Sequence, residues 1–277
     1  MAKKMKTKKK VSVSAFFPCY NDAGTIASMV ELATLTLKKV ANDFEVIVID
    51  DGSSDNSREI LKELSQSNPY LKLVFHEKNK GYGGALRSGF KTASKDLIFY
   101  TDGDAQYDIS ELLNLLTKLS DNVDIVQGYK IKRSDPWYRI IIGDLYNFGV
   151  KLAFAIKIRD VDCDFRLIRR SVFDKVRLEH NSGVITVEMV KKFQDAGFKF
   201  AQVPVSHYFR SYGKSQFFNF KRVAHVAIEL LILWRELVLA KWLRINTSKM
   251  TSSPTTKEWG FIGRVRMTFF HLFHPRE

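Results

Sequence analysis

The sequence predicts an α/β protein with a mostly parallel central sheet and flanking helices. Short apolar runs alternate with segments that carry apolar residues at helical spacing, five times over about 130 residues, and this alternation indicates βαβ units. Polar clusters follow the apolar runs, at the strand ends where open parallel sheets bind ligands. A chain of 277 residues with 45% hydrophobic and 27% charged residues suits one large domain, or one domain with an appendage.

The strands of the first half are predicted from apolar runs that end in proline, aspartate or a glycine-containing turn. We expect strands over residues 11–17, 44–49, 71–75, 97–100 and 124–127. The first run ends at Pro18 and the second in Asp50-Asp51-Gly52-Ser53-Ser54. A lysine-rich arm over residues 1–10 precedes the first strand and is expected to be disordered.

Helices are predicted between these strands from apolar residues three and four apart and from capping residues. The first covers residues 25–39, after the cap residues Asn21 and Asp22. The second is capped by Ser54 or Asp55 and ends near Ser67. A basic, glycine-rich loop over residues 78–84 leads into the third, which ends near Thr92, and the fourth covers residues 110–119.

The second half of the chain is less regular. We expect a helix with exposed aromatic residues over 137–156, a polar loop into a short strand over 161–170, a helix over 184–196 and a strand over 200–208. The stretch 220–243 is long enough to span a bilayer, but His225, Glu229, Arg235 and Glu236 interrupt it. It therefore predicts an amphipathic helix that packs on the core or lies in a membrane interface.

The charge of the chain points to an anionic partner. Net charge is +14 and the pI is about 9.6, which suits nucleic acid, a phosphorylated substrate or a membrane surface. In the tail from Gly260, arginines are interleaved with phenylalanines, which suits an anionic bilayer or a solvated basic tail. The two cysteines, Cys19 and Cys163, make no disulfide framework or zinc site, and favour a reducing cytosol.

The most informative stretch is Asp102-Gly103-Asp104, directly after the fourth strand. In an extended backbone residues i and i+2 point the same way, so the two carboxylates are expected side by side, with Gly103 leaving room for a ligand. A divalent cation relieves their repulsion, and Mg²⁺ or Mn²⁺ is often shared between carboxylates and a substrate's phosphates. The alternative is a strand that ends in a polar turn.

Three other clusters add to this interpretation. The carboxylates after the second strand, Asp50 and Asp51, can accept hydrogen bonds from a ribose or a base edge, or cap a helix. The glycine loop has Leu86 where a dinucleotide-binding fingerprint has its third glycine, and it does not match a Walker A loop. A basic glycine loop at a helix N-terminus still suits a phosphate. Grouped cations can stabilise a leaving diphosphate or bind an anionic acceptor, or be solvated surface charges. These cations are Lys130, Arg133, Arg139, Arg210 and Lys214.

Together these motifs resemble family-2 glycosyltransferases with a GT-A fold, and among them the polyprenyl-phosphate sugar transferases. The resemblance covers residues 11–218, as one glycosyltransferase domain. Residues 219–277 remain outside it, as C-terminal amphipathic helices that suit association with a membrane. The motifs are Pro18-Cys19-Tyr20-Asn21-Asp22, residues 48–55, Asn79-Lys80-Gly81 with Gly83 and Gly84, residues 102–106, and Arg210-x-x-Gly213-Lys214-Ser215. The chain departs from the family pattern at three positions. Lys130 stands where related enzymes often have arginine, Asp22 where many have glutamate, and Asp108 where many have proline.

The resemblance implies a role for each motif. Donor binding is implied for Pro18, Tyr20, Asp22, Asp51, Gly83, Asp102 and Asp104, and metal binding for Asp102, Asp104 and Gln106. Catalysis is implied for Asp104, Arg210 and Lys214, and contact with the acceptor or its phosphate for Lys130, Arg133, Arg139, Arg210 and Ser215. A sugar-hydroxyl acceptor needs a general base, for which Asp164 and Glu188 are candidates.

The predicted function is an inverting, Mg²⁺- or Mn²⁺-dependent transfer of a sugar. The donor is a UDP- or GDP-linked sugar, and the acceptor is a polyprenyl phosphate, undecaprenyl or dolichyl, at the cytoplasmic face of the membrane. One alternative is transfer to a sugar hydroxyl of a glycan or glycolipid. Another is a non-catalytic, basic nucleic-acid- or membrane-binding protein, although the sequence contains no recognised nucleic-acid motif, so no nucleic-acid partner is expected.

Overall fold

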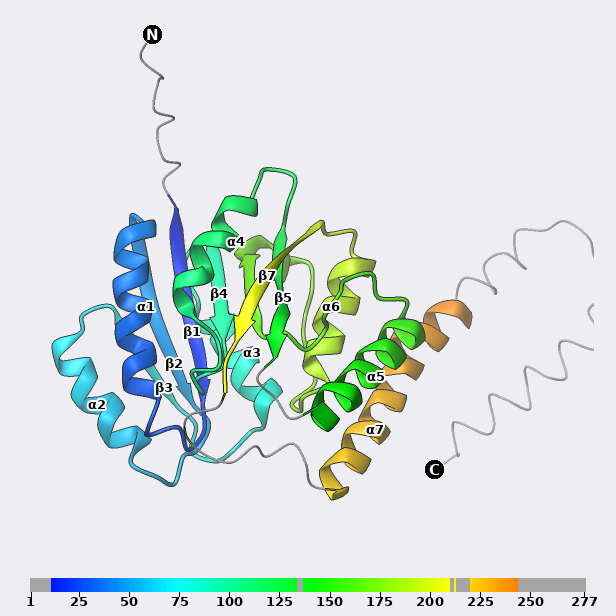
Figure 1. Ribbon diagram of the computed structural model, residues 1–277, viewed down its shortest axis with the longest axis horizontal. Helices are drawn as coiled ribbons and strands as arrows, with labels where there is room; N and C mark the ends of the chain where they lie inside the picture. The colour runs from blue at the N-terminus through cyan, green and yellow to red at the C-terminus, as the bar shows by residue number, and fades with distance from the viewer. Residues whose placement is uncertain (1–10, 134–136, 210–211, 213–219, 244–277) are drawn as a thin grey trace, which may run out of the picture. The chain divides into compact units, whose positions relative to one another are not determined.

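The computed structural model describes residues 11–133, 137–209, 212 and 220–243. Its central sheet has seven strands in the order β3-β2-β1-β4-β6-β5-β7, with β6 antiparallel to its neighbours and the other six parallel (Figure 1). The strands are β1 (Ser12–Cys19), β2 (Asp43–Asp50), β3 (Leu71–Phe75), β4 (Leu97–Thr101), β5 (Ile125–Arg133), β6 (Phe165–Arg169) and β7 (Phe200–His207). The predicted α/β class with a mostly parallel sheet is confirmed.

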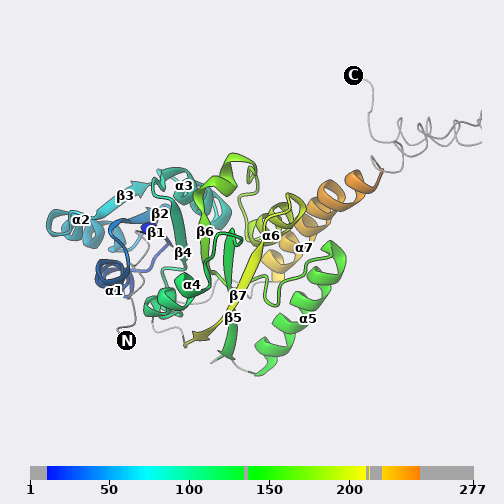
Figure 2. The same cartoon turned by 90° about the horizontal axis from the view of Figure 1, so that it is seen from above.

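Helices cover both faces of this sheet. Alternate residues of a strand point to opposite faces, so β1 sends Val13, Ala15 and Phe17 into one core cluster and Phe16 into the other. The first cluster lies under α1 (Ile26–Val40), α2 (Ser57–Ser67) and α4 (Leu112–Lys118), and the second under α3 (Tyr82–Thr92) and α6 (Ile185–Asp195). Figure 2 shows these two helical layers on either side of the strands.

The fourth and second helices differ from their predictions for local reasons. The helix over 110–119 is a 3₁₀ turn (Ile109–Glu111) followed by α4, because Asp108 caps the turn by accepting the Ser110 amide at 2.8 Å. The N-cap of the second helix is Asn56, rather than the predicted Ser54 or Asp55. Asp55 Oδ1 still accepts the Ser57 amide at 3.0 Å, so the aspartate helps to start the helix from outside it.

Two long helices lie beside α6 at the β7 end of the sheet (Figures 1 and 2). They are α5 (Trp137–Phe154) and α7 (Phe220–Trp234), joined by a 2.9 Å hydrogen bond from Trp234 Nε1 to the Ala153 carbonyl. Residues 1–234 form one compact unit and residues 235–277 a second, in which the described part begins with a π-helical turn, Arg235–Leu239. Over the described ranges, no helix has both the length and the hydropathy to cross a bilayer. The predicted arm over 1–10 and the tail from Gly260 lie outside the described residues.

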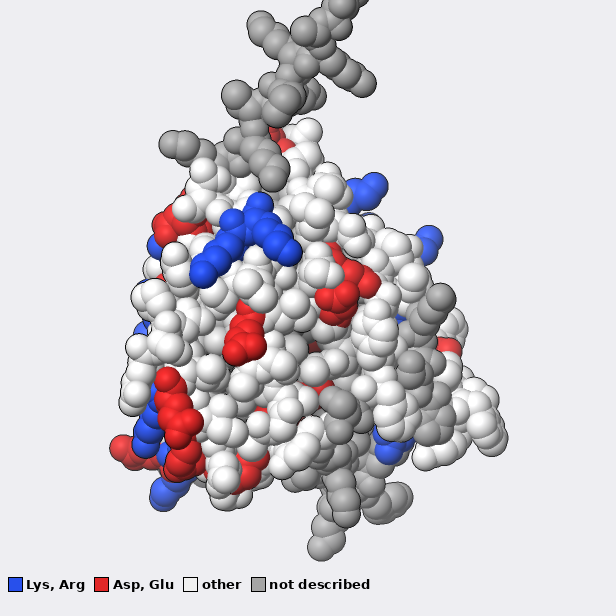
Figure 3. All heavy atoms as spheres, turned by 60° about the vertical axis from the view of Figure 1, so that its left-hand side comes forward, with Lys and Arg blue, Asp and Glu red and all other residues white. Residues whose placement is uncertain are grey.

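Charges of both signs are mixed on the face that Figure 3 shows. Lysines and arginines form small separate groups there, with acidic side chains between them. A duplex or single strand of nucleic acid is bound through a continuous basic track along its phosphates. This face therefore gives no support to the nucleic-acid alternative.

Candidate active site

The candidate site lies at the carboxyl ends of β1, β2 and β4. β1 pairs with β2 on one side and β4 on the other, so the chain order reverses at β1. Ligands of open α/β sheets bind at such a switch point. Three predicted acidic clusters meet here, because Asp22 follows β1, Asp51 follows β2 and Asp102 follows β4.

The loops after β1 and β2 are clasped together by Asn21. Its backbone has φ of 59°, a left-handed conformation that asparagine tolerates. Its Oδ1 accepts the amides of Ser54 at 2.8 Å and Asp55 at 3.3 Å, and its own amide donates to Ser53 Oγ at 3.0 Å. These bonds hold the neighbouring Tyr20, which is 41% exposed, beside the end of β2.

Asp50 and Asp51 have different surroundings although they are adjacent. Asp50 is fully buried and forms an ion pair with Arg58 at 2.6 Å, which gives it a structural role. Asp51 Oδ1 accepts a hydrogen bond from His76 Nδ1 at 2.6 Å and from the Lys80 amide at 2.8 Å. The sequence analysis missed His76, whose only signal was its place directly after a predicted strand.

The turn after β4 departs from the predicted geometry. The strand ends at Thr101 and residues 103–105 form turns and a bend, so the alternation of an extended strand does not apply to Asp102 and Asp104. We expected Gly103 to leave room for a ligand, and the structure shows a different need for glycine at this position. A Cβ on Gly103 would lie 2.7 Å from the Pro18 carbonyl oxygen, so this glycine lets the turn pass over the end of β1.

The two carboxylates of this turn contact different groups. Asp102 Oδ1 accepts the Tyr82 hydroxyl, on the first turn of α3, at 2.7 Å. Asp104 is buried, and its Oδ1 accepts the Gln106 amide at 3.2 Å. Both remain hard oxygen ligands, the kind that Mg²⁺ and Mn²⁺ take in combination with substrate phosphates. Over the described residues, no group of three or more His, Cys, Asp or Glu side chains forms a metal cage. Two carboxylates on one turn fit a cation that a substrate helps to bind.

The reversed strand β6 brings a third carboxylate to this edge. Thr101 pairs with Phe165 in the antiparallel β4–β6 ladder, so Asp164 stands opposite Asp102. Asp164 Oδ1 accepts the Tyr100 hydroxyl at 3.2 Å and lies 3.7 Å from Arg166 Nη1. Burial raises the pKa of the Asp164 carboxyl above its ordinary value, against the opposing effect of Arg166. The structure therefore places one of the two predicted bases at the site.

The other predicted base, Glu188, has a structural role instead. Its side chain is fully buried on α6, where it accepts the amides of Glu179 at 2.9 Å and His180 at 3.1 Å. Lys192 Nζ forms an ion pair with it at 2.6 Å. A carboxylate with these three donors stabilises the loop before α6, and we withdraw it as a candidate base.

Gly83 and Gln106 are also used within the protein. The Gly83 amide donates to the Asn181 carbonyl at 2.7 Å, and a Cβ on Gly83 would meet the backbone of residues 180–182. Gly83, for which donor binding was implied, therefore uses its amide to hold the loop before α6. Gln106 Nε2 donates to the Tyr208 carbonyl at 3.1 Å, which ties the turn after β4 to the end of β7. A role for Gln106 as a metal ligand gains no support from this contact.

The predicted acceptor cations are only partly described. Lys130 lies on β5, with its Nζ 3.1 Å from the Asp162 carbonyl and 3.7 Å from Asp160 Oδ2. Burial lowers the pKa of Lys130, but nearby carboxylates, Asp160 foremost, outweigh it and raise it. Arg139 is half-buried on α5. The side chain of Arg133, and all of Arg210, Lys214 and Ser215, lie outside the described residues.

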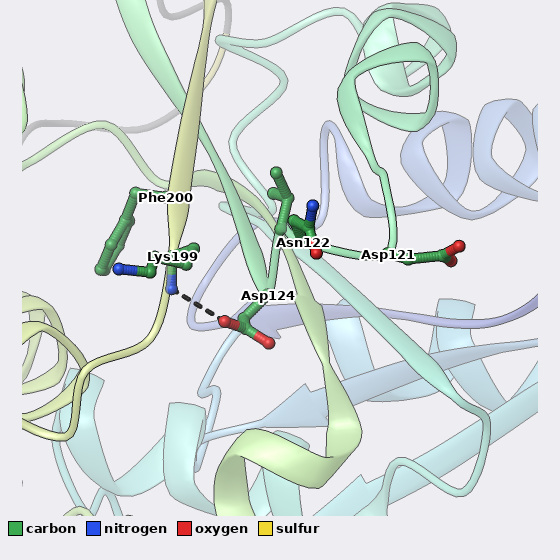
Figure 4. Close-up of a pocket in the computed structure, with 6 residues that line it drawn as sticks. Asp121, Asn122, Asp124, Lys199 and Phe200 are labelled. Carbon is green, nitrogen blue, oxygen red and sulfur yellow. Dashed lines mark hydrogen bonds between the residues drawn. The ribbon is translucent and has the colours of Figure 1, made fainter.

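A hollow at the other end of the sheet is distinct from this site. It measures about 530 Å³ and lies at the starts of β5 and β7 (Figure 4). Its lining is Asp121, Asn122, Val123, Asp124, Lys199 and Phe200. Asp124 Oδ2 accepts the Lys199 amide at 2.8 Å, which joins the two strand starts. Because ligands of such sheets bind at the carboxyl ends of strands, we do not assign the donor to this hollow.

Comparisons with known proteins concern the family and the fold of the chain. A family model described as glycosyl transferase family 2 matches residues 14–177, more than half of the chain. Glucosyl-3-phosphoglycerate synthase from Mycobacterium tuberculosis, solved with phosphoglyceric acid, has a TM-score of 0.62 and 14% identity, over 82% of this chain and 79% of that chain. The same synthase with Mn²⁺, UDP and glucosyl-3-phosphoglycerate gives the same values. A structure described as a mycobacterial protein has a TM-score of 0.58 and 18% identity, over 82% and 72%. The structural likeness concerns the fold, whereas the family match contains Asp51, Asp102, Asp104 and Asp164.

Proposed function

The chain belongs to glycosyl transferase family 2, and we propose that it transfers a sugar from a UDP- or GDP-linked donor to a polyprenyl phosphate. We propose further that the transfer is inverting and metal-dependent, and that the protein works as a peripheral protein at the cytoplasmic face of a membrane. The glycosyltransferase activity follows from the family. The acceptor, the metal and the location are the proposal.

The donor half of the proposal rests on the clustered carboxylates. Asp51 and the exposed Tyr20 lie on adjacent loops, where a nucleoside would contact them. Asp102 and Asp104 would hold Mg²⁺ or Mn²⁺, which neutralises the departing diphosphate. The M. tuberculosis synthase, similar in fold, was solved with Mn²⁺ and UDP together, which supports this assignment.

The observation that carries the lipid acceptor is the exposed apolar face of α5. Leu145, Phe148 and Leu152 are exposed by 66%, 67% and 74%, although a helix on a soluble protein usually turns such residues inward. Trp137 and Ile141 continue the same face at helical spacing, and both are more than half exposed. The opposite side of α5 buries Val150 and Phe154. We call the exposed residues 137, 141, 145, 148 and 152 the α5 apolar face.

Helix α5, which carries this face, contacts the loop that leads into the site. Asn147 of α5 donates to the Arg159 carbonyl at 2.8 Å and accepts the Val161 amide at 3.2 Å. The same loop continues through Asp160 and Asp162 to Asp164, at the edge of the site. An amphipathic helix with aromatic and aliphatic residues on one side inserts into the boundary of a bilayer. A lipid phosphate held there would therefore reach the site from the bilayer surface.

The chemistry of a phosphate acceptor suits the residues present. A lipid phosphate is already anionic near neutral pH, so it needs positive charge to position it more than it needs a base. Lys130 and the net charge of +14 favour such an acceptor. Attack of a phosphate oxygen on the anomeric carbon, with departure of the nucleoside diphosphate from the other side, is one displacement and inverts that centre.

A second candidate is transfer to a hydroxyl of a soluble or glycan acceptor. Asp164 favours it, because this carboxylate stands opposite Asp102 with a raised pKa and can accept a proton from a hydroxyl. The synthase that is similar in fold was solved with phosphoglyceric acid, which is not a lipid. The two candidates differ in the product and in their need for Asp164.

The test combines the product with the apolar face. Wild-type protein is incubated with vesicles that contain undecaprenyl phosphate, with Mn²⁺ and with labelled UDP- or GDP-sugars. We expect a lipid-linked sugar that mild acid releases. Leu145→Glu should reduce this transfer and vesicle binding about tenfold, since a charge in the interface opposes insertion, and should leave donor hydrolysis unchanged.

The matched control is Leu113→Glu, because Leu113 is 51% exposed on α4, outside the α5 apolar face. It should behave as wild type. Transfer to a soluble hydroxyl acceptor, with no lipid-linked product from any donor, would establish the second candidate and reject the first. Loss of that transfer in Asp164→Asn would then identify the base.

A further inference from the structure

We propose that His76 is a positioning residue that fixes the Asp51 carboxylate for recognition of the donor nucleoside. The inference rests on the donor-binding role proposed for Asp51, and it adds a residue that no sequence motif singled out. It also extends the donor site from the loop after β2 to α3, through Ser88.

The geometry around His76 is a continuous hydrogen-bonded chain. His76 follows β3, and its amide donates to the Asp50 carbonyl at 2.9 Å, which extends the β2–β3 ladder by one residue. Its Nδ1 lies 2.6 Å from Asp51 Oδ1 and its Nε2 lies 2.8 Å from Ser88 Oγ on α3. His76 is 4% exposed and Asp51 is 3% exposed, so water does not compete for these contacts.

The protons of this chain follow from the chemistry of the groups. An ionised carboxylate only accepts hydrogen bonds, so the ring nitrogen that faces Asp51, Nδ1, carries a proton. The Ser88 hydroxyl can donate to Nε2 of a neutral ring or accept from a charged one. In both cases Ser88 fixes the ring plane, and the ring plane fixes the direction of the bond to Asp51.

The contacts leave one carboxylate oxygen for a ligand. Among the described residues, both hydrogen bonds that Asp51 accepts end on Oδ1, from His76 and from the Lys80 amide. The segment with Lys80 comes this close because residue 52 is glycine. Gly52 has φ of 80°, and a Cβ at that position would lie 2.8 Å from the Asn79 nitrogen. A carboxylate gripped at one oxygen by two donors does not rotate. Its Oδ2 is therefore held in one position before the donor binds, which lowers the ordering cost of binding.

A second histidine–carboxylate pair shows what a purely structural contact looks like here. His180 Nδ1 lies 3.2 Å from Glu188 Oε2. That carboxylate also accepts two backbone amides and pairs with Lys192, and these contacts engage both oxygens. Asp51 differs because its partners engage a single oxygen. His180 therefore serves as the matched control.

The test uses two substitutions that separate the two ring nitrogens. The amide nitrogen of asparagine can occupy the place of Nδ1, and that of glutamine the place of Nε2. Binding of UDP and GDP, each with Mn²⁺, is measured by calorimetry. The donor KM and the kcat are measured for donor hydrolysis, and Tm is measured for each variant. For the nucleotide that the wild-type protein binds, we expect the Kd of His76→Asn to stay within about threefold of the wild-type value. We expect His76→Gln to weaken binding about tenfold or more, because it loses a hydrogen bond to a charged group.

Two further measurements separate positioning of the donor from stability. We expect kcat of His76→Gln to stay within about twofold, and His180→Gln to lower Tm without changing nucleotide binding. Equal effects of the two His76 variants, weakened binding that follows Tm, or a loss confined to kcat would each overturn the proposal. So would a wild-type protein that binds neither nucleotide. Because this assay contains no acceptor, its failure is distinct from a failure of the polyprenyl-phosphate proposal.

Discussion

Replacing Tyr82 with phenylalanine removes one hydroxyl from the candidate metal ligand Asp102. Tyr82 Oη donates to Asp102 Oδ1 at 2.7 Å from the first turn of α3. Burial, reinforced by Asp102, raises the pKa of Tyr82 well above its ordinary value, so the hydroxyl keeps its proton through the working pH range. The ring remains in the variant, so the packing of α3 should be almost unchanged.

The expected size of the effect follows from two independent estimates. A hydrogen bond to a charged group contributes about 1.5–3 kcal/mol, which corresponds to a factor of about 10 to 150. Removing the hydrogen-bond partner of a metal ligand typically costs about 10- to 100-fold in metal affinity or activity. The two ranges agree, and we expect the Mn²⁺ concentration at half-maximal activity to rise about tenfold or more.

The assay is donor hydrolysis, or transfer, over a Mn²⁺ titration at saturating donor. Tyr70→Phe is the control, because Tyr70 stacks on Phe44 with ring centroids 4.3 Å apart and precedes β3 at the opposite end of that strand. Wild-type Mn²⁺ dependence in Tyr82→Phe would refute the reasoning that this hydroxyl orients a metal ligand. A fall in Tm that accounts for the lost activity would refute it too, since the contact would then be structural.

Three further predictions concern stability and the donor loops. Burial raises the pKa of Glu45, but hydrogen bonds from Lys72, Ser14 and Ser94 outweigh burial and lower this pKa to about 2. The lowered pKa contributes up to ~3 kcal/mol of stability above pH 4.5, and this contribution is lost as the pH falls toward 2. Acid unfolding of Glu45→Gln, followed by circular dichroism, should show a smaller loss across that window than wild type. Glu188→Gln should lower the free energy of unfolding by about 2–4 kcal/mol and leave kcat of the folded protein unchanged; a selective loss of kcat would restore Glu188 as a base. Gly52→Ala would be strained at the positive φ of this position and crowded by Asn79, so it should lower the free energy of unfolding by about 1–3 kcal/mol and raise the donor KM. An unchanged donor KM would show that this loop does not contribute to the donor site.

The corrections share a physical origin. The local sequence placed Gly83 and Gln106 in motifs that follow predicted strands, and Glu188 in the predicted helix over 184–196. It contained no information on which other groups would reach them. Lys192 and the amides of residues 179 and 180 engage Glu188, and the Asn181 carbonyl engages the Gly83 amide. A polar group that is fully bonded within the protein has little left for a ligand.

The membrane prediction shifted from one helix to another. The sequence pointed to residues 219–277, and the tail of that range lies outside the described residues. Among the described side chains, α5 carries more exposed large hydrophobic residues than any other helix. The sequence showed exposed-looking aromatics there, but periodicity cannot tell an apolar face that meets a core from one that meets solvent or lipid. The exposed fractions of the α5 side chains in the structure made that distinction.

The sequence by itself determined the α/β class, most strand and helix positions, the family, and the meeting of Asp22, Asp51 and Asp102 at one edge. Hydrophobic periodicity and turn residues act over a few neighbours, and parallel strands bring their carboxyl ends to the same side. The tertiary structure alone decided the reversal of β6, the approach of Asp164 to Asp102, and the grip of His76 on Asp51. These depend on contacts between distant segments, and the role of a carboxylate is set by the donors that surround it in space rather than by its neighbours along the chain.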